Sequence, residues 1–203
     1  MSKYILQFPK EIKPLEDNNQ WLDAVALLYD QWKKNPMEEH NLVCLAMEAW
    51  YALLELDYLE TARLLLEYYK CDPGIPLEIE AEQEKIHDIL SEAMSFGLRK
   101  YSDSVLFNMY IGYAAKATPI HFVDFMEEWE KTAFSMIQKA YSKDDTDMLT
   151  KLFYYESIDR YAEGYTTASR NFWEKISISD WGDSDVQHHL FCMLDGDKYH
   201  RTD

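Results

Sequence analysis

The sequence predicts an all-α protein of eight or nine antiparallel helices, arranged as a helical bundle or as a short array of helix pairs. Hydrophobic residues recur at steps of three and four from Asn18 onward, which is the spacing of one helix face. No segment alternates hydrophobic and polar residues in the way that is typical of a strand. Hydrophobic residues make up 47% of the 203 residues, enough for the core of a single domain over residues 1–203.

Three successive helices are predicted in the N-terminal part of the chain. The first covers residues 19–34, where hydrophobic residues share one face until an Asn-Pro pair stops the helix. The second covers residues 38–56, in which leucines, alanines and a tryptophan lie on one side. Asp57 is a suitable N-cap and begins a third helix that continues through Tyr68.

A break separates these helices from the rest of the chain. Residues 71–76 read Cys-Asp-Pro-Gly-Ile-Pro, a run that interrupts any helix, and a division of the domain is expected only there. Beyond the break, isoleucines and leucines at helical spacing predict a fourth helix that ends near Gly97. Ser102 or Asp103 then opens a fifth helix, which runs through Ala114.

The C-terminal part predicts three more helices and a short docking helix. Thr-Pro at 118–119 combines an N-cap with a first-turn proline, and an aspartate pair can cap the following helix. In order, the expected elements are a sixth helix from Thr118 to Ala140, a seventh from Asp144 or Asp145 through Phe153, an eighth over 159–176, a loop over 177–183 and a docking helix over 184–195.

Two segments of the chain are similar to each other. Ala-Trp-Tyr-Ala at 49–52 and Ile-Gly-Tyr-Ala at 111–114 lie 62 residues apart, about twice the length of a tetratricopeptide unit. The segment 107–114, followed by Pro119, resembles the first helix of such a unit, in which small residues let paired helices approach. The resemblance implies tetratricopeptide-like helix packing rather than membership of that family. The alternative is a coincidental similarity between amphipathic helices.

Acidic residues are concentrated in the middle of the chain. Between Met37 and Lys100 there are fourteen Asp and Glu against five Lys and Arg, which accounts for nine of the seventeen net negative charges. On a helix Glu80 faces Glu84, and such like-charged pairs cost about 0.2 to 0.5 kcal/mol each. A surface that keeps them is expected to bind a partner. The candidate interface residues are Glu78, Glu80, Glu82, Glu84, Asp88, Glu127, Glu128, Asp180, Asp183 and Asp185.

A structural explanation of these acids competes with the functional one. A helix that starts at Pro76 places them in its first turns, where the positive end of the helix dipole stabilises carboxylates. The two explanations make different predictions for the surface. A binding protein that uses its charge is expected to gather Glu80, Glu84 and Asp88 with Glu127 or with the tail acids at 180–185 on one contiguous face.

Composition excludes several classes of partner and of protein. At pI 4.7 the chain repels nucleic acids and anionic membranes, so a basic protein is the expected partner. No stretch of about eighteen uncharged apolar residues is present, and the N-terminus has no signal-peptide pattern. Three cysteines without a CxxC pair fit a reducing compartment. We therefore expect a cytoplasmic protein without a membrane span.

No pattern in the sequence is typical of an enzyme or of a cofactor site. There is no P-loop, no nucleophile elbow and no dinucleotide-binding glycine motif. Glu84-x-x-His87 has the spacing of a di-iron ligand pair but lacks a second copy. One group of metal-ligand residue types lies on the last helix without a fourth ligand of its own: Asp185, His188, His189 and Cys192. The sequence thus favours a protein that is not an enzyme and holds no cofactor and no metal.

In size, acidity and helical content the whole chain resembles the immunity proteins of bacterial contact-dependent growth inhibition and related polymorphic toxin systems. This resemblance implies a cognate toxin domain, often an RNase or DNase, that is neutralised in the cytoplasm by binding over or beside its active site. Immunity proteins diverge with their toxins, so no residue role is carried over. Two alternatives remain open: a tetratricopeptide-like adaptor that binds peptides on a concave face, and a helical enzyme or metal protein of another kind.

Overall fold

The computed structural model describes residues 2–70, 79–122, 126 and 128–198 of the chain. Every regular element within these residues is a helix, which confirms the all-α prediction. In chain order the elements are α1 (Ile12–Glu16), α2 (Trp21–Lys34), α3 (Glu39–Tyr68), α4 (Ile79–Lys100), α5 (Val105–Ala117), the 3-10 turn η1 (Pro119–His121), α6 (Trp129–Lys143), α7 (Met148–Ile158), α8 (Glu163–Trp173), α9 (Ile178–Trp181), α10 (Asp185–Met193) and the 3-10 turn η2 (Gly196–Lys198).

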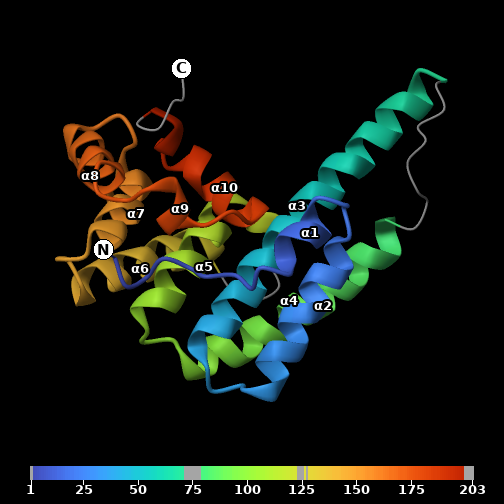
Figure 1. Cartoon of the computed structure of the whole chain (residues 1–203), viewed down its shortest axis with the longest axis horizontal. Helices are drawn as coiled ribbons and strands as arrows, with labels where there is room; N and C mark the ends of the chain where they lie inside the picture. The colour runs from blue at the N-terminus through green and yellow to red at the C-terminus, as the bar shows by residue number, and fades with distance from the viewer. Residues whose placement is uncertain (1, 71–78, 123–125, 127, 199–203) are drawn as a thin grey trace.

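The helices form two neighbouring groups that are joined by α3 and α5 (Figure 1). In the first group α2 and α4 pack against α3 and against each other, and the rings of Trp32 and Phe96 meet with their centroids 5.5 Å apart. In the second group α5 packs against α6, α6 against α7, and α7 against α8. Helix α5 also packs on α3, and nine of its 13 residues are buried.

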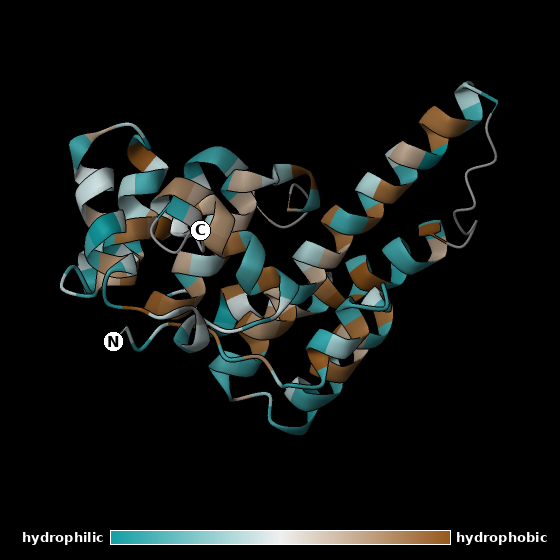
Figure 2. Ribbon diagram, turned by 45° about the horizontal axis from the view of Figure 1, so that its top comes forward, coloured by the Kyte–Doolittle hydropathy of each residue, from teal (hydrophilic) through white to brown (hydrophobic). Residues whose placement is uncertain are grey.

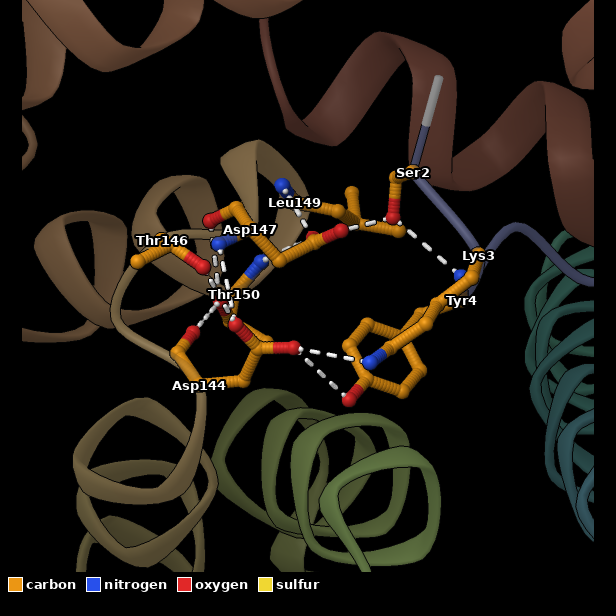
Figure 3. A network of polar contacts seen from close by, with 8 residues as sticks. All are labelled: Ser2, Lys3, Tyr4, Asp144, Thr146, Asp147, Leu149 and Thr150. Carbon is orange, nitrogen blue, oxygen red and sulfur yellow. Dashed lines mark hydrogen bonds and ion pairs between the residues drawn. The ribbon is translucent and has the colours of Figure 1, made fainter.

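The segment before α1 crosses the molecule and ties distant helices together (Figure 1). The Ser2 hydroxyl donates a hydrogen bond to Asp147 Oδ1 at 2.9 Å, and the Tyr4 hydroxyl donates to Asp144 Oδ2 at 3.0 Å (Figure 3). The Tyr110 hydroxyl of α5 in turn donates to the Tyr4 carbonyl at 3.0 Å. These bonds fix the start of the chain on the α6–α7 turn, more than 140 residues away in sequence.

Helix α3 is one continuous helix of 30 residues, so the predicted division into two helices at Asp57 was wrong. Asp57 does not cap a helix. Its carboxylate accepts a hydrogen bond from Gln83 Nε2 at 2.8 Å and lies 3.3 Å from His121 Nε2. The surrounding sequence contains neither glycine nor proline and is rich in leucine, alanine and glutamate, which are good helix formers. A helix continues through a single aspartate in such a context.

The start of α6 also differs from the prediction. Pro119 opens only the 3-10 turn η1, and α6 begins at Trp129 rather than at Thr118. The residue before it, Glu128, adopts the left-handed conformation at φ 48°. A non-glycine residue in this conformation interrupts a right-handed helix. Residues 123–125 and 127 lie outside the described part of the chain.

The region 159–181 departs from the prediction at two points. Helix α8 begins at Glu163 instead of Asp159, because the Asp159 carboxylate accepts the backbone N–H of Tyr161 at 2.9 Å and forms a turn. The predicted loop over 177–183 contains α9. Ser177 Oγ accepts the backbone N–H of Asp180 at 3.1 Å, and the buried Trp181 ends the helix.

The caps of two helices lie slightly later than the sequence indicated. Ser104, rather than Ser102 or Asp103, accepts the backbone N–H of Phe107 at the start of α5. Asp147, rather than Asp144 or Asp145, caps α7. The last helix agrees with the prediction over 184–195. In it Ser184 forms a capping box with Gln187 at the start of α10.

One contiguous hydrophobic core contains residues from Ile5 to Leu194. It includes side chains of α2, α3 and α4 as well as those of α5 to α8 and α10. Residues 71–76, where a division of the domain was predicted, lie outside the described part of the chain.

Candidate partner interface

The candidate interface begins with a row of carboxylates on α4. Ile79, Ile86 and Leu90 are buried, so they turn one face of α4 toward the core. Glu80, Glu84 and Asp88 follow one another at steps of four on the outer side and are exposed. We call these three residues the acid row. They make no ion pair or hydrogen bond with any described residue.

The next acidic residue on the same side of α4, Glu92, does form such bonds. Glu92 lies four residues after Asp88 and binds Lys33 Nζ at 2.5 Å and the Tyr29 hydroxyl at 2.6 Å. Those bonds, that to Lys33 above all, lower the pKa of the Glu92 carboxyl. Glu92 therefore joins α4 to α2, whereas the acid row keeps its charge available to a partner.

A hollow of about 370 Å³ lies beside the acid row, where α3, α4 and η1 meet. Two members of the row, Glu84 and Asp88, line it together with Asp57 of α3. Its other lining residues are Leu53, Gln83, His87, Ile120 and His121. The Ile120 side chain is 67% exposed, so an apolar group stands next to three carboxylates. The hollow thus combines negative charge with an apolar contact point.

His121 does not offset the charge of this hollow at neutral pH. Its side chain is buried, and burial lowers the pKa of the imidazole, an effect that Asp57 opposes and His87 reinforces. A neutral imidazole leaves the negative charge of Asp57 in place. At neutral pH the hollow is therefore expected to keep the charge of its carboxylates.

Of the other predicted acids on α4 and directly before α6, Glu82 and Glu128 differ from the acid row in burial or in pairing. Glu82 lies on α4 but is half-buried. Glu128 is exposed and forms an ion pair with Lys131 at 2.9 Å. Pro76, Glu78 and Glu127 lie outside the described residues.

Two of the tail acids, Asp183 and Asp185, line a second hollow that shares no residue with the first. Lys13 binds Asp185 at 2.7 Å. Asp180 lines neither hollow and accepts a hydrogen bond from the Ser177 hydroxyl at 2.7 Å. The tail acids and the acids of α4 therefore do not share one of these hollows.

A pair of buried carboxyls was not predicted. Glu48 of α3 is fully buried, and its two oxygens have no hydrogen-bond partner among the described residues. Glu16 of α1 is 2% exposed, and both its oxygens accept the backbone N–H of Asp185. Burial raises the pKa of Glu16 to about 7 and that of Glu48 well above its usual range. The only signal in the sequence was a glutamate within the hydrophobic run of residues 42–54.

This buried pair has the strongly shifted pKa values that are typical of catalytic groups, but its position argues for a structural role. A catalytic carboxyl must reach a substrate within hydrogen-bond distance. Neither Glu16 nor Glu48 lines any of five hollows found on the described surface. Glu16 instead joins α1 to the start of α10 through the backbone N–H of Asp185.

The metal-ligand residue types of α10 point in different directions. His188 and Cys192 are one turn apart, with Nε2 and Sγ at 3.7 Å. His189 lies on another face, where its ring packs against Trp50 and Tyr51 at centroid distances of 5.6 and 5.3 Å. Within the described residues no group of three or more His, Cys, Asp or Glu is arranged to hold a metal ion.

No known relative is found for this chain. No protein-family model matches it, and no curated protein or solved structure is significantly similar. Arguments about its function therefore rest on its own residues. In the described part of the chain, no helix combines the length and the apolar character that a membrane crossing needs.

A second surface feature is an exposed apolar stretch at the end of α3. Residues 57–70, which we call the α3 arm, extend beyond α2 and α4 (Figure 1). None of these fourteen residues is buried. Hydrophobic residues, brown in Figure 2, nevertheless continue along the arm. The exposed ones include Tyr58 at 70%, Leu64 at 54%, Leu65 at 55%, Tyr68 at 78% and Tyr69 at 70%. The sequence had predicted a helix over this stretch, through Tyr68, without indicating that its apolar residues are exposed.

Proposed function

We propose that this protein neutralises a basic toxin, most simply a nuclease, by binding over or beside its active site. The observation that carries the proposal is the acid row: Glu80, Glu84 and Asp88 are exposed, unpaired among the described residues and adjacent to a hollow with a third carboxylate at Asp57. Exposed acids without an ion pair or hydrogen bond to a described residue are available for a partner.

A nuclease is the partner whose chemistry fits this row best. It holds the phosphates of its substrate with Lys and Arg, and carboxylates can occupy the same positions. Side chains four residues apart on a helix are separated by about 5–6 Å, so the row offers a series of evenly spaced negative groups. Charge of this sign also steers a basic domain toward the surface and raises association rates to roughly 10^8 per molar per second at low salt.

The apolar part of the hollow would exclude water from the interface, which charged groups alone do not do. Ile120 is exposed beside Glu84 and Asp88, and its burial against a partner would exclude water from the neighbouring ion pairs. Ion pairs that lose water are harder to break, which slows dissociation. The proposed interface consists of the acid row, Asp57 and Ile120, and excludes the tail acids.

In biological terms the proposal is an immunity protein of a contact-dependent growth inhibition or related polymorphic toxin system. It acts in the cytoplasm of the cell that must survive the toxin. Its activity is stoichiometric binding, without catalysis and without a cofactor. The chain's net charge of −17 is consistent with this role.

The proposal is tested by capture of the partner with the tagged protein from lysate of its native host at low salt. The wild-type chain is compared with the acid-row variant, which carries Glu80→Lys, Glu84→Lys and Asp88→Lys. The control Asp145→Lys, Glu163→Lys, Glu174→Lys reverses three exposed acids elsewhere and changes the net charge equally. Circular dichroism establishes that all three proteins are folded.

We expect the wild-type chain and the control to retain one basic protein in a one-to-one complex, and the acid-row variant to bind it at least about tenfold more weakly. The nuclease activity of the captured protein should fall when wild-type chain is added. A captured partner that binds the folded acid-row variant as tightly as the wild type contradicts the proposal. So does a captured protein whose activity the wild-type chain leaves unchanged.

A further inference from the structure

The α3 arm exposes many apolar side chains to solvent. A helix with apolar residues on several sides is normally buried, yet no residue from Asp57 to Lys70 is. Contiguous exposed apolar patches of this kind mark interaction sites in soluble proteins. The arm is about 20 Å long at 1.5 Å per residue, which corresponds to two heptads of a helix–helix contact.

One set of residues of α3 follows the spacing of a helix-packing seam. Steps of three and four residues alternate along one side of the helix, as in the a and d positions of a coiled coil. The seam consists of the apolar residues Tyr51, Leu54, Tyr58, Leu65 and Tyr68, with the polar Thr61 between Tyr58 and Leu65. Since a continuous seam of this type packs against one other helix, the arm presents half of a helix pair.

The base of the seam is occupied within the fold, and the rest is not. The Tyr51 ring packs against Trp21 at a centroid distance of 5.7 Å and against His189 of α10 at 5.3 Å. Beyond it, Tyr58 and Leu65 are 70% and 55% exposed. The chain therefore covers the seam as far as α10 reaches and leaves the following two heptads open.

The charges around the seam decide which kind of helix fits. Glu55 and Asp57 flank its base on either side. Arg63 lies on the opposite side of the helix, where Glu60 at 2.5 Å and Glu67 at 2.8 Å hold its guanidinium. A second copy of this chain, with a net charge of −17, would bring like charges against Glu55 and Asp57. A helix with basic flanks would bring opposite ones.

We propose that the α3 arm is the docking site for a basic amphipathic helix of the partner. The apolar stripe of that helix packs on Tyr58, Leu65 and Tyr68, and its Lys or Arg side chains reach Glu55 and Asp57. This inference rests on the proposed function for the basic character of the partner. It adds a second, apolar contact region at Tyr58, Leu65 and Tyr68, none of which belongs to the acid row. Asp57 borders both regions and is unchanged in the variants of each, so the two can be tested independently.

The arm is suited to mutagenesis because its residues stabilise little of the fold. Exposed side chains can be replaced by polar ones without leaving a cavity in the core. The seam variant, Tyr58→Gln, Leu65→Gln, replaces two apolar residues of the seam with polar ones and leaves the net charge of the chain unchanged. The matched control Ile158→Gln, Tyr161→Gln replaces two exposed apolar residues of the α7–α8 region, which are 52% and 95% exposed.

The test uses the full chain and a fluorescent synthetic peptide of three heptads with Leu at a and d and Lys at e and g. A second peptide carries Glu in place of each Lys. Binding is followed by fluorescence anisotropy at low and at high salt, and sedimentation equilibrium reports whether the chain associates with itself. The seam variant, its control and the acid-row variant are measured in the same way.

We expect the basic peptide to bind the wild-type chain and the control, and to bind the seam variant at least about tenfold more weakly. The acidic peptide should bind neither the wild-type chain nor the control. Equal binding of the basic peptide to the wild type and the seam variant, or no binding to either, overturns the inference. Self-association that the seam variant abolishes overturns it as well, because a second copy is then the occupant.

The two proposals fail in distinguishable ways. If the captured host partner loses affinity for the acid-row variant but binds the seam variant normally, the proposed function stands and the α3 arm is not its docking site. If only the seam variant loses the host partner, the arm is the docking site and the acid row has no part in binding.

Discussion

Both carboxylate oxygens of Glu16 accept the backbone N–H of Asp185, each at 2.9 Å. This contact connects α1 with the first residue of α10, 169 positions later. Glu48 of α3 is buried nearby; burial, reinforced by the carboxyls of Glu16 and Asp185, raises its pKa. Three elements that are far apart in sequence thus meet at a buried site that holds more carboxyl groups than it can keep ionised.

The first prediction concerns the pH dependence of stability. Burial raises the pKa of Glu16 from its usual 4.5 to about 7 and that of Glu48 well above its usual range. The folded chain then binds protons more tightly than the unfolded chain does. The contribution of Glu16 to stability is complete below pH 4.5 and is lost as the pH rises through about 7, and that of Glu48 changes in the same direction. Urea unfolding at pH 5 and pH 8 should therefore show a lower free energy of unfolding at pH 8.

The variant Glu48→Gln should reduce this pH dependence, because glutamine has nearly the shape of the protonated acid and no charge to lose. We expect it to be more stable than the wild type at pH 8. The exposed Glu80→Gln serves as the control and should retain the wild-type slope. A Glu48→Gln variant whose stability falls with pH as steeply as that of the wild type would contradict the assignment.

The second prediction concerns the N-cap of α7. Asp147 Oδ1 accepts the backbone N–H groups of Leu149 and Thr150 and the hydroxyl hydrogen of Ser2 (Figure 3). Loss of an N-cap of this type costs about 0.5–2 kcal/mol. Asp147→Ala should lower the free energy of unfolding by this amount, as measured by chemical denaturation. Asp145→Ala, an exposed aspartate two residues earlier, should change it by no more than about 0.5 kcal/mol.

The third prediction concerns the close approach of α5 and α6. A Cβ atom on Gly112 would lie 2.9 Å from the Ala133 carbonyl oxygen and 3.0 Å from Met136 and Ile137. Because one of these atoms belongs to the backbone, the helices would have to separate. Gly112→Ala should cost about 1–3 kcal/mol of stability despite the better helix propensity of alanine. The control Ser135→Ala, on the exposed side of α6, should be neutral. A stabilised Gly112→Ala variant would show that the helices pack less closely.

The fourth prediction concerns the attachment of the C-terminal helices. The buried Gln187 side chain donates to the carbonyls of Leu6 and Trp181 and completes the capping box of α10. Gln187→Leu leaves these groups without partners, which costs about 1–3 kcal/mol for each. Hydrogen exchange should then accelerate in α9 and α10. Gln138→Leu, at an exposed position of α6, should leave that exchange unchanged.

Prediction from sequence succeeded where a helix depends on its own residues. The regions of α2, α4, α7 and α10 follow from hydrophobic spacing and from stop signals, and the described structure contains helices there. It failed at Asp57 and at Pro119, since both residue types also occur inside helices or in short turns. At Asp57 the helix-forming residues on both sides allow α3 to continue, and its carboxylate meets Gln83 and His121 of other elements instead of capping a helix.

The candidate interface was only partly predictable. The acids of α4 were visible as a pattern, and their outward orientation follows from the buried isoleucines and leucine of the same helix. The contribution of Asp57 and Ile120 was not visible, because α3 and η1 meet α4 only in three dimensions. The separation of the tail acids from this surface was invisible for the same reason.

The sequence by itself determined that this protein is helical and strongly acidic, because helix spacing and net charge are properties of the chain alone. Only the tertiary structure decided which of two residues of the same type is buried and which is exposed. Glu48 and Glu84 are both glutamates on helices, yet one is fully buried and the other exposed. Leu53 lies in the core, whereas Leu65 of the same helix is open to solvent. Burial depends on which distant segment covers a residue, and local sequence does not encode that.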